Sequence, residues 1–334
     1  MSEILDHTSS RLHAYGVFSA DIIDHVSESI DRISRLSGFG LFFDVVDIDE
    51  SMVQNSGILD IKPKNYDESS AMVIHLPMAN PLDGNQVYQI ATISRMFPGR
   101  RVIAAANPSG INKSRNQLWS PQDRALVSQG DFRFATPALE HYLTDQKNVK
   151  QCSDLRIDQI GSSLGADLAV GFALREIAQV DKQLLVEPAS ATKRSVLNLA
   201  KTFSSTNTAL DTYVESNRLA TFERVRAKQG ISDLRYAIGL LRLSNIALTR
   251  GIASGAFGHN LETLLRTYDN APDTTVMWGT DTEFGSATLE SELNRVEQRA
   301  NTQIGRIMVQ GGKHAMVNDL ALMSAAALQV FGKD

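Results

Sequence analysis

A serine stands at the centre of Gly161-Ser162-Ser163-Leu164-Gly165, which has the pattern G-x-S-x-G and occurs once in the chain. An apolar segment precedes this pattern, and a segment rich in small residues follows it. Glycines two residues before and after Ser163 let a strand and a helix cross without clashes between Cβ atoms, so that the serine Oγ stands clear of the sheet. The pattern therefore predicts a nucleophilic serine on a tight strand-to-helix turn.

A serine hydroxyl is a weak nucleophile near neutral pH, so it needs a base, and the base needs an acid that orients it. Of the seven histidines, only His314 lies in a loop directly after a late predicted strand, in Gly311-Gly312-Lys313-His314. His75 lies inside a predicted strand, where we expect a hydrogen-bonded core residue. We therefore expect His314 to act as the base for Ser163.

The orienting acid should follow the strand that precedes His314 in the sequence. Asp281 stands just past the end of the apolar segment 275–278 and is the leading candidate. Glu283, two residues further on, and Glu187, at the end of an earlier strand, are the alternatives. The predicted catalytic set is therefore Ser163, His314 and Asp281, with two other carboxylates left open.

These residues can meet only if the elements that carry them end at the same edge of one sheet. Short apolar segments predict strands at 41–46, 58–61, 71–76, 101–106, 155–160, 183–186, 275–278 and 304–309. Helical periodicity or composition predicts helices at 20–36, 86–96, 137–145, 166–180, 289–300 and 318–331. Strands that alternate with helices predict a mostly parallel sheet covered on both faces, which is an α/β fold of the doubly wound kind.

The alternation of strands and helices is interrupted between residues 189 and 272, where the residue pattern is helical and no strand is evident. We expect an N-terminal helical segment at 1–40, a first part of the core at 41–188, a helical cap or lid at 189–272, and a second part of the core at 273–334. A cap is favoured because ligands of such sheets bind beyond the carboxyl ends of the strands, where this insertion emerges. Extra helices packed on the side of the sheet are the alternative.

With these motifs in this order, the chain resembles the α/β-hydrolase fold superfamily, in particular its serine esterases and lipases with a helical cap. The order Ser163, Asp281, His314 is the nucleophile, acid and histidine order of that family. The resemblance covers roughly residues 40–334. It implies hydrolysis of a small-molecule or lipid ester, or a thioester, through an acyl-enzyme, with no cofactor and no metal.

The oxyanion hole departs from the usual form of that family, which often carries His-Gly at the end of its third strand. If His75 is aligned with the family histidine, the donor is Pro77, which has no N–H group. A shift by two positions makes Ala79 the donor, with Met78 as second choice. The Leu164 amide, at the N-terminus of the predicted helix, would be the other donor.

Composition excludes several classes of protein. The chain of 334 residues is 43% hydrophobic and 21% charged, which is typical of a folded globular protein. A net charge of −5 without a basic cluster argues against nucleic acid as the main ligand. The single cysteine, Cys152, excludes an intramolecular disulfide. No apolar run reaches the ~20 residues of a transmembrane helix, and no apolar leader follows Met1, so we expect a cytoplasmic protein, with homo-oligomers left open.

Other functions remain to be weighed against ester hydrolysis. An acyltransferase would use the same three residues, and a hydrolase-fold protein can also be a non-catalytic binding module. A serine nucleophile argues against the haloalkane dehalogenases and epoxide hydrolases of this fold, which use an aspartate. A nucleotide-binding dehydrogenase also has a doubly wound sheet, but it needs G-x-G-x-x-G after an early strand, and residues 105–110 do not supply it.

Overall fold

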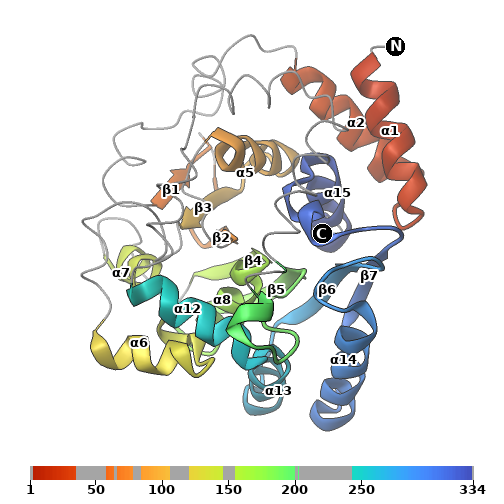
Figure 1. Cartoon of the computed structure of the whole chain (residues 1–334). Helices are drawn as coiled ribbons and strands as arrows, with labels where there is room; N and C mark the ends of the chain where they lie inside the picture. Colours follow the sequence, from red (N-terminus) through yellow and green to blue (C-terminus); the bar gives the residue numbers. More distant parts are fainter. Residues whose placement is uncertain are drawn as a thin grey trace.

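The computed structural model describes residues 3–34, 58–63, 66–77, 84–105, 120–145, 155–199, 202 and 243–332 (Figure 1). Within these residues, seven strands form one sheet: β1 (Ile58–Ile61), β2 (Ser70–His75), β3 (Arg101–Ala105), β4 (Arg156–Ser162), β5 (Gln179–Val186), β6 (Asp273–Gly279) and β7 (Gly305–Val309). They lie in the order β1-β3-β2-β4-β5-β6-β7. The pair β1–β3 is antiparallel, and every other pair of neighbours is parallel. All carboxyl ends of the six parallel strands therefore meet at one edge.

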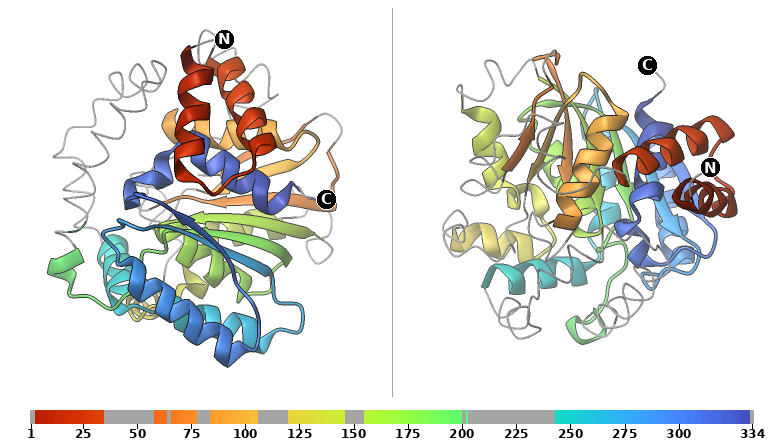
Figure 2. Two further views of the ribbon diagram at one scale, coloured as in Figure 1. Left: turned by 90° about the vertical axis from the view of Figure 1, so that its right-hand side faces the viewer. Right: turned by 90° about the horizontal axis from the view of Figure 1, so that it is seen from above.

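Side chains alternate between the two faces of this sheet, and each face has its own apolar cluster. In β2, for example, Met72 and Ile74 belong to one cluster, while Ala71 and Val73 belong to the other. The first face is covered by α5 (Gly84–Met96) and α15 (Leu320–Phe331), and the second by α7 (Pro137–Thr144), α8 (Leu164–Ala173), α13 (Phe257–Thr267) and α14 (Ser286–Ala300), as the left view of Figure 2 shows. The α/β-hydrolase fold class predicted from the sequence is confirmed by this arrangement.

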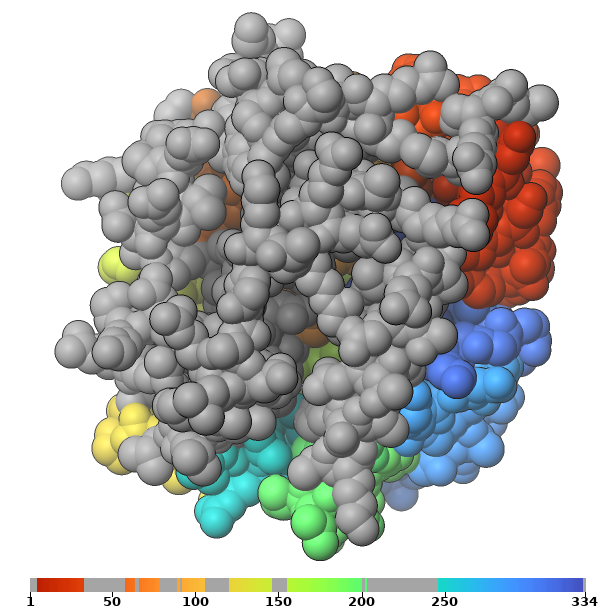
Figure 3. All heavy atoms as spheres, turned by 45° about the horizontal axis from the view of Figure 1, so that its top comes forward, coloured from red at the N-terminus to blue at the C-terminus, as the bar shows by residue number. Residues whose placement is uncertain are grey.

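Two helices precede the sheet, α1 (Glu3–Tyr15) and α2 (Ala20–Ser34). The apolar face of α2, with Ile23, Val26 and Ile30, packs in the same cluster as α5 and α15. In Figure 3 these N-terminal helices lie directly beside the C-terminal elements. Asp319, which caps α15, accepts hydrogen bonds from Arg11 and Tyr15 of α1. The N-terminal segment thus forms an outer layer over α5 and α15.

Several element boundaries differ from those expected. The helix predicted over 166–180 ends at Ala173, because Glu176 has φ +52° and β5 already begins at Gln179. A helix α6 (Pro121–Ser128) was not predicted, although Ser120 and Asp123 form a capping box at its start. The strand expected at 41–46 lies outside the described residues.

The expected insertion between β5 and β6 is described only at its two ends. Residues 203–242 lie outside the described part of the chain. Further on, α12 (Leu243–Ser254) packs against α6, whereas α13 packs against α8 and α14. The last helix of the expected insertion is therefore one of the helices that cover the sheet. Among the described helices, none combines the length and the apolar character that crossing a membrane requires.

Candidate active site

The G-x-S-x-G pattern folds as the predicted strand-to-helix turn. β4 ends at Ser162, α8 begins at Leu164, and Ser163 between them has φ 55° and ψ −122°. A positive φ is strained for a residue with a side chain, and such strain is concentrated at functional sites. The Ser163 N–H donates to Val186 O at 2.8 Å, which ties the turn to the neighbouring end of β5.

Both glycines of the pattern are required by close backbone contacts. A Cβ on Gly161 would stand 2.3 Å from the carbonyl oxygen of Gly165. A Cβ on Gly165 would stand 2.1 Å from the carbonyl oxygen of His75, at the end of β2. Because neither contact can be relieved by moving a flexible side chain, the predicted steric reason for these glycines is confirmed.

Ser163 and His314 are brought together at the carboxyl edge of the sheet. His314 opens the short 3-10 helix η4 (His314–Asn318), which follows β7. Its Nε2 lies 2.9 Å from Ser163 Oγ, and its Nδ1 lies 3.2 Å from Glu187 Oε2. The residues Ser163, His314 and Glu187 are 3%, 3% and 1% exposed, so this line of polar groups is screened from bulk water.

The carboxylate beside His314 is that of Glu187, the alternative, and not that of Asp281, the leading candidate. Glu187 follows β5 with φ +50°, and its N–H donates to Met277 O at 2.8 Å. Its side chain also accepts from the Gly279 N–H at 2.7 Å and from the Thr282 hydroxyl. Asp281 is exposed instead: its N–H donates to Gly312 O, and its carboxylate accepts from Thr280 Oγ1. The backbone of this loop thus holds the Asp281 side chain outward.

Glu283, the third candidate acid, contacts His314 in a different way. Its Oε2 accepts the backbone N–H of His314 at 3.0 Å, so it positions the chain rather than the ring. The next residue, Phe284, has its ring centroid 4.2 Å from that of the imidazole. Sequence reasoning missed Thr282 and Phe284; their nearness to Asp281 was the only available signal.

The predicted oxyanion donors are described only in part. Leu164 is the first residue of α8, where the N–H groups of a helix have no acceptor within the helix. Its amide directly follows Ser163, as expected. Met78 and Ala79 lie outside the described residues. Of the segment before them, His75 is buried and its Nε2 lies 3.0 Å from Gln159 Oε1.

A second buried carboxylate supports the segment that carries Glu187. Asp167, on the first turn of α8, accepts hydrogen bonds from the N–H and the hydroxyl of Ser190. Burial raises the pKa of Asp167 to about 7, against the lowering effect of these hydrogen bonds. Asp167 therefore links the helix that follows the nucleophile to the loop that follows the acid.

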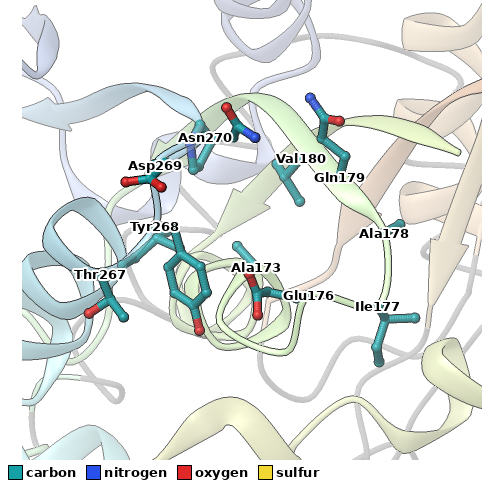
Figure 4. A pocket seen from close by; sticks show the side chains of 12 residues that line it. Ala173, Glu176, Ile177, Ala178, Gln179, Val180, Thr267, Tyr268, Asp269 and Asn270 are labelled. Carbon is teal, nitrogen blue, oxygen red and sulfur yellow. The ribbon is translucent and has the colours of Figure 1, made fainter. Parts of the chain in front are cut away.

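A pocket of about 530 Å³ lies elsewhere, between the C-terminal ends of α8 and α13 and the start of β5 (Figure 4). Glu176, Tyr268 and Asp269 are among its lining residues. The strands are parallel here, so this pocket opens at the edge of the sheet opposite to Ser163. Within the described residues, no group of three or more His, Cys, Asp or Glu side chains is placed to hold a metal ion.

No family model and no curated protein matches the sequence, whereas solved structures match the fold. The chain is similar to MGS-M2, an α/β-hydrolase enzyme from a Medee basin deep-sea metagenome library, at 10% identity, 83% coverage of this chain, 94% of that chain and a TM-score of 0.47. It is similar to MenH from S. aureus at 14% identity, with 82% and 98% coverage and a TM-score of 0.45. It is similar to a thioesterase domain from the curacin biosynthetic pathway at 14% identity, with 81% coverage of this chain, 94% of that domain and a TM-score of 0.44.

The fold itself is defined by this chain's own topology. A mostly parallel sheet, with a strained serine between its central strand and the following helix, is the α/β-hydrolase fold. A serine, a histidine and a glutamate stand in one hydrogen-bonded line at its carboxyl edge.

Proposed function

We propose that this protein is a serine hydrolase that cleaves a carboxylic ester or thioester through an acyl-enzyme. In this proposal Ser163 is the nucleophile, His314 the general base and Glu187 the orienting acid. The observation that carries it is the line of contacts from Ser163 Oγ through the imidazole to the Glu187 carboxylate. A nucleophile, a base and an orienting group within hydrogen-bond reach are the signature of covalent catalysis.

The reaction would proceed in two halves. With its proton on Nδ1, facing Glu187, the His314 ring presents a lone pair on Nε2 to the serine hydroxyl. As Oγ bonds to the carbonyl carbon, its proton moves to Nε2, and the imidazolium is stabilised by Glu187. The tetrahedral intermediate then expels the alcohol or thiol, which takes the proton from Nε2. Water then gives a proton to the same nitrogen as its oxygen bonds to the acyl carbon. The second tetrahedral intermediate breaks its bond to Oγ, which takes the proton back from Nε2, so that the acid is released and Ser163 is restored.

The surroundings of the three residues support this sequence of steps. The Leu164 N–H at the start of α8 would donate to the oxyanion. Glu187 is held by the Gly279 N–H and the Thr282 hydroxyl in addition to the imidazole. An acid fixed by two further donors keeps the ring in one tautomer and orientation, which is the main role of the third residue.

The test combines covalent labelling with turnover. Purified protein is treated with a fluorophosphonate probe, the labelled residue is located by mass spectrometry, and hydrolysis of p-nitrophenyl esters from acetate to palmitate is measured. Labelling of Ser163, and loss of both labelling and turnover in Ser163→Ala, are expected. The matched control is Ser128→Ala, which removes a surface hydroxyl of α6. Folded protein that does not label at Ser163 would be a non-catalytic binding protein instead.

A further inference from the structure

Arg194 is a half-buried cation beside the candidate site that no described carboxylate pairs with. It lies in the segment after β5, and its N–H donates to Ala253 O, near the end of α12, at 2.9 Å. Its guanidinium donates to Thr192 Oγ1 at 2.7 Å, to Thr202 Oγ1 at 3.2 Å and to the Glu283 carbonyl at 3.1 Å. All three acceptors are uncharged groups.

Several other buried or half-buried arginines of the described part of the chain have a carboxylate partner. Arg101 pairs with Asp60 at 2.7 Å, and Arg295 pairs with Glu262 at 2.6 Å. The carboxylate of Glu283, whose carbonyl Arg194 contacts, accepts the His314 backbone N–H instead. Burial lowers the pKa of Arg194, with no carboxylate to offset it. The guanidinium nevertheless stays charged.

The position of Arg194 relates it to the reacting groups. Its guanidinium carbon lies 5.1 Å from the centroid of the Phe284 ring, and the same ring lies 4.2 Å from the imidazole of His314. The residue whose carbonyl it contacts, Glu283, also holds the His314 backbone. The cation and the base therefore both contact the same aromatic side chain.

A guanidinium has five N–H donors, of which three are used here, one on each nitrogen. One N–H on each of the two terminal nitrogens has no hydrogen bond to the described residues. Two donors and one positive charge suit a single carboxylate, which accepts two N–H groups from arginine.

We infer that Arg194 binds a carboxylate on the substrate, so that the substrates are esters or thioesters carrying a negative charge away from the scissile bond. This inference rests on the proposed function and adds the substrate class. Interactions with remote parts of a substrate can select it and orient it at the reacting centre. The three uncharged contacts would then hold the guanidinium in place before the substrate arrives.

The test uses two esters that differ in charge but share a leaving group and an acyl chain of about the same length. These are p-nitrophenyl valerate, which is neutral, and mono-p-nitrophenyl glutarate, which carries a carboxylate. Arg194→Gln should lower kcat/KM for the glutarate ester by about 10- to 100-fold, mainly through KM, because a charge-assisted hydrogen bond is lost. The kcat/KM of Arg194→Gln for the valerate ester should stay within about twofold of wild type. For the glutarate ester, the kcat/KM of Arg194→Lys should lie between those of wild type and Arg194→Gln. The control Arg32→Gln removes the same charge from an exposed side chain of α2.

A second readout does not require turnover. Glutaramate, which carries one carboxylate, should slow fluorophosphonate labelling of Ser163 more than valeramide, which is neutral, and Arg194→Gln should abolish that difference. Equal losses on both esters would overturn the inference, because the guanidinium would then only support the His314 loop. Unchanged kinetics on both esters would overturn it as well. Absence of labelling at Ser163 in wild type would instead refute the proposed function, so the two failures are distinguishable.

Discussion

Two buried histidines in this protein have similar surroundings but different hydrogen-bonding partners. His314 is 3% exposed and His75 is 1% exposed, and each lies beside a phenylalanine ring, Phe284 or Phe172. His314 stands between the hydroxyl of Ser163 and the carboxylate of Glu187. His75 faces the side-chain amide of Gln159. Burial is common to both, so burial alone does not distinguish a base from a core residue.

The partners of His75 form a neutral chain that crosses the sheet. Gln159 Nε2 donates to Gln183 Oε1 at 2.9 Å and to the Ala169 carbonyl at 3.0 Å, so its Oε1 is left to accept from His75 Nε2. Gln183 in turn donates to Thr274 Oγ1 at 2.7 Å. These side chains belong to β2, β4, β5 and β6. Without a carboxylate, burial lowers the pKa of His75 to about 4, and the ring stays neutral at pH 7.

The two histidines should differ most in how far kcat falls when each imidazole is removed. His314→Gln should reduce kcat on the best ester by about 10⁴-fold or more, because no other group among the described residues is placed to take the serine proton. His75→Gln should keep kcat within about fivefold, since an amide can donate to Gln159 in its place. Steady-state kinetics on both variants, with circular dichroism to verify folding, measures the difference. Loss of catalysis in folded His75→Gln would break the comparison.

A second test concerns the carboxylate that makes His314 different. Glu187→Gln should lower kcat by about 10²- to 10⁴-fold, because the amide cannot stabilise an imidazolium and favours the wrong tautomer. The matched variant Asp281→Asn makes the same chemical change on an exposed side chain and should stay within about twofold of wild type. Ester hydrolysis by the two proteins side by side is the measurement. A larger loss in Asp281→Asn would return the acid role to Asp281.

The candidate site could be predicted from the sequence where its geometry is local. Five residues around Ser163 contain both glycines that the turn requires, and the position of His314 after a late strand follows from the alternation of elements. The acid could not be chosen, because three carboxylates end neighbouring strands or loops. Which one reaches His314 depends on backbone contacts between distant segments, such as Asp281 N–H to Gly312 O.

Seven of the eight predicted strands overlap strands of the sheet, because a buried β-strand has a short apolar run as its own signal; the strand predicted at 41–46 lies outside the described residues. Helix ends were predicted less well: the helix after Ser163 continues in apolar periodicity beyond Ala173, although the chain turns there at Glu176. Arg194 and Phe284 carry no motif at all. Their significance comes from a contact between the segment after β5 and the loop after β6, which only the folded chain brings together.

A buried carboxylate, that of Asp167, extends the comparison from histidines to acids. Asp167 is held by the neutral groups of Ser190, and its pKa of about 7 lies above the ordinary 3.8. The folded state then keeps a proton that the unfolded chain loses, so this group's contribution to stability is complete below pH 3.8 and is lost as pH rises toward about 7. Relative to Asp167→Asn, wild type should lose up to ~1.4 kcal/mol of unfolding free energy per pH unit in that window. Urea unfolding of both proteins from pH 4 to 8 measures this, and parallel curves would refute it.

His75 should show the opposite sign over a narrower range. Its pKa in the folded protein is about 4, below the ordinary 6.5, so the unfolded chain takes up a proton first as the pH falls. Its contribution to stability is present above pH 6.5 and is lost as the pH falls toward about 4, by at most ~1.4 kcal/mol per pH unit. His75→Gln cannot take up that proton, so the unfolding free energy of wild type minus that of the variant should decrease from pH 7 to pH 4. Urea unfolding at half-unit pH steps measures it. A constant difference would mean that His75 takes up its proton at the same pH in the folded and the unfolded protein, and the neutral chain across the sheet would then have to accommodate a charge below about pH 6.5.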